Sequence, residues 1–169
     1  MKTLREWAKP VLALLLVCGV MGALMAATQM ITKPIIEARA QDGPDYKQEL
    51  FPNATFEAAN IEGVEEAYRT AEGDWAFLMK VRGYNKSNPM ELLIGIRADG
   101  SIVGVRVLAQ AETEGIGSQV LEDAYLQQYD GLSDIANIDG ISGATVTSKA
   151  VQKALREAIR LSGEAKGGA

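Results

Sequence analysis

The chain has 169 residues and a formal net charge of −5, with no histidine and a single cysteine, Cys18. These counts exclude a Ser-His-Asp or Cys-His nucleophile and every metal site that needs imidazole or several thiolates, so a redox cofactor held by this chain alone must be organic. The acidic balance also argues against nucleic acid as a partner.

The first predicted element is a transmembrane helix at residues 11–31. That segment contains no charged residue, and a helix of its length spans roughly 32 Å, enough for a hydrocarbon core of about 30 Å. Lys2, Arg5 and Lys9 precede it. The positive-inside rule therefore places residues 1–10 in the cytoplasm and the rest of the chain on the extracytoplasmic face of the cell membrane, with the helix in contact with lipid.

Two other interpretations of the N-terminal part remain open. Ala38-Arg39-Ala40 resembles the cleavage site of a signal peptide, although the apolar run is longer than the usual range of about 7 to 15 residues and ends well before this site. Cys18 could be a lipidation site, but the bulky Val17 precedes it. A lipid-facing or helix-packing role for Cys18 is favoured.

The rest of the chain is predicted to form a single domain, because nothing in it suggests repeats or a second core. Residues 32–44 are expected to be a short stalk, residues 45–162 the globular domain, and residues 163–169 a disordered, frayed tail.

Antiparallel strands are the clearest signal within this domain. Residues 90–98 and 101–110 flank Asp99-Gly100, a pattern typical of a hairpin with a two-residue type I′ turn. The implied cross-strand pairs are Ile96 with Val103, Gly95 with Gly104, Ile94 with Val105 and Leu92 with Val107. The glycine pair would leave a notch that either a flat ligand, another backbone or a closely packed helix fills.

Other segments complete an α+β domain with an antiparallel sheet and flanking helices. Residues 75–82 alternate between apolar and polar or smaller side chains, and residues 64–70 form a weaker run, so both are predicted strands. Residues 116–127 and 147–162 have apolar side chains at helical spacing, and Gly163 is expected to end the second helix.

The segment Asp139-Gly140-Ile141-Ser142-Gly143-Ala144-Thr145 places hydroxyls on a small, flexible turn just before that helix. The unpaired N–H groups and the positive end of the dipole at a helix N-terminus favour an anionic group such as a phosphate. The plain alternative is a turn with a helix cap, in which Thr145 or Thr147 accepts backbone N–H bonds.

Asp-x-x-Ser-Gly-Ala-Thr resembles the flavinylation motif of the FMN-binding domain family, which includes the G subunit of the Rnf electron transport complex and the C subunit of the sodium-translocating NADH:quinone oxidoreductase. Glu112-Thr113-Glu114-Gly115-Ile116-Gly117 resembles the family's Glu-Thr-Pro-Gly-Leu-Gly loop, with Glu114 in place of proline. Gly83-Tyr84 and the hairpin resemble the preceding strands, although residues 85–89 replace a glycine-rich link. The short chain favours the Rnf subunit.

The resemblance implies FMN bound covalently by a phosphoester to Thr145, made by a separate flavin transferase after export. It implies no catalytic residue and no metal. The residues expected to recognise the phosphate are Asp139, Ser142, Gly143 and Ala144. Those expected to line the flavin ring are Glu112, Thr113, Gly115, Ile116 and Gly117. For Glu112, a solvated loop carboxylate is the alternative.

The implied function is that of an electron-carrying subunit of a membrane-bound, ion-translocating ferredoxin:NAD oxidoreductase, the Rnf complex. Such a subunit would relay electrons through FMN among iron–sulfur and other membrane subunits without independent catalytic activity, and the coupling ion, Na⁺ or H⁺, stays open. The alternatives are the C subunit of the quinone reductase, a membrane-anchored flavin sensor, and a non-redox binding module in which Thr145 is unmodified.

Overall fold

The computed structural model describes residues 2–41 and 45–167, which form two compact units divided after Pro44. The first unit is the helix α1, Lys2–Gln41. Its segment Val11–Met30, with a mean hydropathy of 2.4, is long and apolar enough to cross a membrane. The predicted stalk at residues 32–44 is helical as far as Gln41, because that segment is rich in good helix formers.

The second unit contains one sheet of five antiparallel strands, each paired with its neighbours in the chain in the order β1-β2-β3-β4-β5. The strands are β1 Phe56–Ala59, β2 Glu66–Thr70, β3 Trp75–Val81, β4 Met90–Ile96 and β5 Ile102–Ala109. The predicted α+β class with an antiparallel sheet is confirmed. The sequence analysis did not include β1, which pairs only with β2.

The β4–β5 hairpin keeps most of the predicted register but not the predicted turn. Gly95 lies opposite Gly104 as expected, whereas Ile96 pairs with Ile102 and not with Val103. The Gly100 amide donates to the Arg97 carbonyl at 2.8 Å, and within this turn only Gly100 has a positive φ, +93°. A type I′ turn needs two such residues, so the loop is a three-residue turn followed by a bulge.

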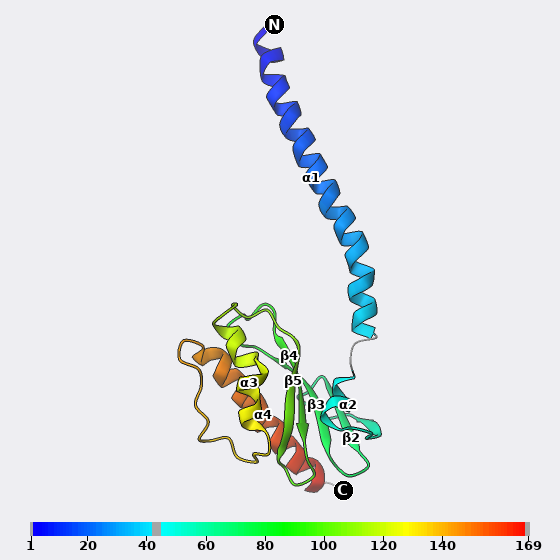
Figure 1. Cartoon of the computed structure of the whole chain (residues 1–169), viewed down its shortest axis with the longest axis vertical. Helices are drawn as coiled ribbons and strands as arrows, with labels where there is room; N and C mark the ends of the chain where they lie inside the picture. The colour runs from blue at the N-terminus through cyan, green and yellow to red at the C-terminus, as the bar shows by residue number, and fades with distance from the viewer. Residues whose placement is uncertain (1, 42–44, 168–169) are drawn as a thin grey trace. The chain divides into compact units, whose positions relative to one another are not determined.

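Helices cover both faces of the sheet (Figure 1). The long helix α4, Thr145–Gly167, packs on β3 and β4 and forms the larger core with side chains such as Phe77, Ile94 and Leu155. The short helix α2, Tyr46–Leu50, contacts β4 and β5 and belongs to a smaller core with Ala76 and Leu93 on the opposite face.

The notch at Gly95 and Gly104 lies under the end of α2. A Cβ at Gly95 would be 3.1 Å from the Cε2 of Phe51, and a Cβ at Gly104 would be 3.0 Å from the Cδ2 of Leu50. The closely packed helix is therefore the correct explanation of the glycine pair, and the notch is filled by the chain itself.

The helix predicted at residues 116–127 is interrupted. It consists of the 3₁₀ helix η1, Gly117–Leu121, the α-helix α3, Asp123–Leu126, and the 3₁₀ helix η2, Gln127–Tyr129. On an uninterrupted helix Tyr129 would lie on the side opposite Val120, and Leu126 would lie about 120° around the axis from it. The extended backbone at Glu122, with ψ 142°, allows all three side chains to reach the core, where each is at most 2% exposed.

The prediction that Gly163 ends the last helix is wrong, because α4 continues to Gly167. Arg160 forms ion pairs with both Glu157 and Glu164, and Ala165 packs against the core beyond the glycine. These contacts stabilise a further turn, so the predicted tail at residues 163–169 is helical as far as Gly167.

Candidate functional site

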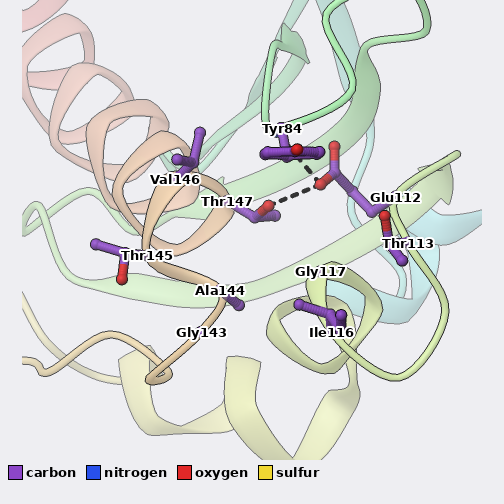
Figure 2. Close-up of a pocket in the computed structure, with 10 residues that line it drawn as sticks. All are labelled: Tyr84, Glu112, Thr113, Ile116, Gly117, Gly143, Ala144, Thr145, Val146 and Thr147. Atoms are coloured by element: carbon purple, nitrogen blue, oxygen red, sulfur yellow. Dashed lines mark hydrogen bonds between the residues drawn. The ribbon is translucent and has the colours of Figure 1, made fainter.

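A cavity of about 440 Å³ lies beside the N-terminal end of α4 (Figure 2). Its walls come from the loop after β3, the loop after β5 and the turn that leads into α4. The lining residues are Tyr84, Glu112, Thr113, Ile116, Gly117, Gly143, Ala144, Thr145, Val146 and Thr147. This volume falls in the range of about 300 to 1,000 Å³ that small-molecule sites occupy.

The structure brings most of the predicted site residues together around this cavity. Those that line it are Glu112, Thr113, Ile116, Gly117, Gly143, Ala144 and Thr145. Those outside the lining are Asp139, Ser142 and Gly115.

Sequence reasoning did not assign three further lining residues, Tyr84, Val146 and Thr147. Tyr84 had been noted only within the motif Gly83-Tyr84, and Thr147 only as a possible cap. The sequence offered one signal for them. Val146 and Thr147 directly follow Thr145, and Tyr84 belongs to the noted motif Gly83-Tyr84.

The first turn of α4 presents free donors to the cavity. The Ala144 carbonyl accepts the first helical bond, from the Ser148 amide at 2.9 Å, so Thr145, Val146 and Thr147 carry the N–H groups that a helix leaves without an intrahelical partner. Gly143, with φ +87°, makes the left-handed turn that leads into the helix. This geometry suits an anionic group.

Thr145 and Thr147 differ although only one residue separates them. The Thr145 side chain is exposed, and no hydrogen bond that the structure gives for the described residues involves its hydroxyl. Thr147 is 1% exposed, and its hydroxyl donates to the Oε2 of Glu112 at 2.7 Å. Neither threonine is therefore seen to cap the helix, and the hydroxyl of Thr145 is available for chemistry.

Glu112 is a buried carboxylate, 7% exposed, so its interpretation as a solvated loop residue is wrong. Besides the Thr147 hydroxyl, it accepts hydrogen bonds from the Tyr84 amide at 3.3 Å and the Asn85 amide at 3.1 Å. A Cβ at Gly83 would lie 2.6 Å from Oε1, and one at Gly117 would lie 2.7 Å from Oε2. The absence of these two side chains makes room for the carboxylate.

Three large apolar side chains are exposed around the cavity. Tyr84, Ile116 and Val146 are 71%, 51% and 52% exposed, and they are the exposed large hydrophobic residues among the described residues of the second unit. All three line the cavity. Their convergence on one place indicates a surface that a flat, partly apolar ligand would cover.

Polar contacts hold the segment that precedes the turn. The Tyr129 hydroxyl donates to the Tyr125 hydroxyl, which donates to the Asp139 carbonyl, each at 3.1 Å. Burial, followed by the hydrogen bond with Tyr125, raises the pKa of Tyr129 above its ordinary value. The Ser148 hydroxyl accepts from the Ile141 amide at 3.0 Å. Asp139 thus contributes its backbone to this network, outside the cavity lining.

Residues 83–160 match the FMN-binding domain family, and this range contains every residue that lines the cavity. The match with an FMN-binding domain thus extends over the whole cavity beside α4, which is the candidate cofactor site.

Its relatives belong to redox complexes. The chain is 25% identical over 159 residues to the G subunit of the proton-translocating ferredoxin:NAD(+) oxidoreductase complex of Clostridium ljungdahlii, with 86% of each chain covered. It is 28% identical to the G subunit of the ion-translocating oxidoreductase complex of Stutzerimonas stutzeri, with 88% of this chain and 77% of the relative covered. The predicted resemblance to the FMN-binding domain family is thus confirmed for residues 83–160, and these two G-subunit relatives are similar over most of the chain.

Among solved structures, the chain resembles the C subunit of the Na(+)-translocating NADH-quinone reductase of Parabacteroides distasonis. The sequence identity is 25% and the TM-score 0.43, with 67% of this chain and 61% of that chain covered.

Proposed function

We propose that this chain is the electron-carrying subunit of a membrane-bound, ion-translocating ferredoxin:NAD oxidoreductase, and that it holds FMN covalently through Thr145. The observation that carries the proposal is the exposed Thr145 hydroxyl at a helix N-terminus, on the wall of a cavity in an FMN-binding domain. The G-subunit relatives supply the complex in which such a carrier would work.

The residues around the cavity fit the two parts of FMN. The free amides of the first turn of α4 suit the phosphate, and the exposed side chains of Tyr84, Ile116 and Val146 suit the apolar faces of the ring. FMN supplies the electron-transfer chemistry, while the protein orients it and sets its surroundings.

In the attachment step, the reacting group of this chain is the Thr145 hydroxyl. Its oxygen would form a bond to the phosphorus of an activated flavin nucleotide held by a flavin transferase, as the phosphorus–oxygen bond to the leaving group breaks and the hydroxyl proton is released. A phosphoester leaves the ring unaltered and prevents loss of the cofactor. Three predicted site residues lie outside the lining: Asp139, Ser142 and Gly115. They would then be needed for recognition by the transferase or for the conformation of the loops.

The membrane helix completes the proposal. Val11–Met30 would anchor the protein in the bilayer, and the basic residues before it would keep the N-terminus in the cytoplasm and the FMN domain outside. Anchoring raises the effective concentration of the flavin near the redox centres of the iron–sulfur and membrane subunits.

The test is covalent labelling. The full chain is produced with a flavin transferase in membranes, separated on a denaturing gel and examined for flavin fluorescence. We expect a fluorescent band for the wild type and for Thr55→Ala, a control that removes an exposed threonine distant in sequence from the cavity loops, and none for Thr145→Ala. A dark wild-type band would reject covalent attachment and favour the non-redox binding module.

Membership of the complex needs a separate test. Affinity purification of the tagged wild-type chain from its own membranes should recover iron–sulfur subunits and ferredoxin-dependent NAD reduction. Recovery of NADH-dependent quinone reduction instead would favour the C subunit of the quinone reductase.

A further inference from the structure

The carboxylate of Glu112 connects the three segments that form the cavity. It accepts from the Tyr84 and Asn85 amides in the loop after β3, it belongs to the loop after β5, and it accepts from the Thr147 hydroxyl in the first turn of α4 at 2.7 Å. No other side chain among the described residues is given hydrogen bonds to both of these neighbouring segments.

The donors around Glu112 are all neutral. None of the ion pairs among the described residues includes this carboxylate, which is 7% exposed. A buried charge is tolerated only where hydrogen bonds replace the lost water, and such charge-assisted bonds are stronger than neutral ones. The position of Glu112 therefore depends on all three donors. The carboxylate in turn holds the segments to which these donors belong.

No side chain in the described part of the chain caps the first turn of α4 in the conventional way. Ala144 stands at the position whose carbonyl begins the helix, and alanine has no side-chain acceptor for the amides of the first turn. The bond between the Ile141 amide and the Ser148 hydroxyl ties this end of the helix to the segment just before it. The bond between Thr147 and Glu112 restrains it against the other two segments of the cavity.

Rotation of the first turn determines where Thr145 points. Residues two apart are separated by about 200° around a helix axis, and Figure 2 shows the side chains of Thr145 and Thr147 on opposite sides of the turn. With Thr147 held inward by Glu112, Thr145 is directed outward, where its hydroxyl is exposed.

We propose that Glu112 is a positioning residue that acts through Thr147: it fixes the first turn of α4 so that the Thr145 hydroxyl is presented for attachment of the flavin. This rests on the proposed function, and it assigns Glu112 a role different from direct contact with the flavin ring.

The decisive variants change Thr147, because they leave the Glu112 charge in place. Thr147→Val keeps the shape and removes the donor, whereas Thr147→Ser keeps the donor. In the full chain with its transferase, we expect Thr147→Val to slow the rate of covalent FMN incorporation about tenfold, in keeping with the loss of one hydrogen bond to a charged group, and Thr147→Ser to stay close to wild type.

Ser162→Ala is the matched control for a general loss of stability. Ser162 lies in the same helix, is 1% exposed and donates to the Ile159 carbonyl at 2.8 Å, so the variant also removes a buried hydroxyl. It is far along the helix from the cavity, and its rate of incorporation should equal that of the wild type.

Glu112→Gln tests the other partner. Whichever way the amide is turned, its NH₂ group faces a backbone N–H of Tyr84 or Asn85, so one donor loses its acceptor. The donor without an acceptor should displace the side chain of residue 112 and weaken its bond to Thr147, so incorporation should slow to a similar extent as in Thr147→Val. The double variant should then be no slower than either single variant.

Hydrogen exchange gives a readout that does not depend on flavin. In the unloaded chain, Thr147→Val and Glu112→Gln should raise exchange at the amides of residues 148–150, the first of which is bonded to the Ala144 carbonyl, and leave the middle of α4 unchanged, whereas Ser162→Ala should not affect residues 148–150. Unchanged exchange there, or wild-type incorporation in Thr147→Val, would overturn the positioning role. Slow incorporation in Glu112→Gln alone would overturn it too, and indicate direct contact with flavin. Failure of the wild type to incorporate FMN would instead reject the proposed function.

Discussion

Two places in the globular unit have room for an extra group, and the protein treats them in opposite ways. At Gly95 and Gly104 the missing side chains are replaced by Leu50 and Phe51 of the same chain, which are 6% and 7% exposed. At the N-terminal end of α4, the apolar side chains around the cavity are exposed to solvent. Missing side chains in a sheet are therefore a poor indicator of a ligand, whereas exposed apolar residues beside free donors are a good one.

Phe51→Ala should give the largest effect in this comparison. It empties the filled notch and should lower the free energy of unfolding by about 3 kcal/mol, the usual cost of removing a buried aromatic side chain. Urea denaturation of membrane-free protein in detergent measures this loss. FMN incorporation below the unfolding transition should stay normal, and a selective loss of incorporation would mean that the two places are coupled.

Gly117→Ala should add strain on the cavity side. The new methyl group would lie 2.7 Å from the Oε2 of Glu112 and 2.9 Å from its Cβ, and such overpacking costs about 2 kcal/mol. The matched control is Gly131→Ala, which has open space but a φ of +77° and so reports backbone strain without a clash. If both variants destabilise equally, packing against Glu112 is not the reason for glycine at residue 117.

Tyr129 should make the free energy of unfolding decrease at alkaline pH. Because burial raises its pKa in the folded state, the folded protein keeps the phenol protonated when the unfolded chain begins to lose its proton near pH 10. The stabilisation is complete below that pH and is lost as the pH rises, at about 1.4 kcal/mol per pH unit. Denaturation between pH 9 and pH 11 should show this decline, and Tyr129→Phe should make it shallower. An equal decline in both proteins would mean that a group other than Tyr129 causes the loss of stability.

Ile116→Ala should have the smallest effect on folding. Its side chain is 51% exposed, so the free energy of unfolding should change by no more than about 0.5 kcal/mol. In the flavin-loaded protein, however, iodide should quench the flavin fluorescence more strongly, because one apolar cover of the ring is gone. Val11→Ala, which alters an exposed position of α1, is the control; equal quenching in all proteins would place the ring away from Ile116.

The sequence predicted elements whose pattern is local and missed those decided by packing. The pairs Gly95–Gly104 and Ile94–Val105 followed from apolar alternation, while the bulge at Val103 arose from a turn one residue longer than expected. The helix break at Glu122 could not be predicted, because it depends on which side chains the core accepts.

The same distinction holds at the site. The turn before Thr145 was predicted because glycines and hydroxyls mark it in the sequence, and the loop containing Glu112 was predicted because it resembles a loop of the FMN-binding domain family. The burial of Glu112 and its bond to Thr147, 35 residues away, were not predicted, because a hydrogen bond between distant loops leaves no periodic signal. Tyr84 was missed as a lining residue for the same reason, since its place beside the cavity depends on the course of a loop.

The strands pair only with their neighbours along the chain, whereas α4, the last element, packs across β3 and β4. Local pairing should let the sheet form early and quickly during folding. The cavity wall that contains Thr145 belongs to α4. A chain whose synthesis stops before residue 145 would therefore have the sheet, but neither the Thr145 hydroxyl nor a complete cavity. If flavin is attached at Thr145 as proposed, the bound cofactor would mark those molecules in which α4 has been translated and has folded against the sheet.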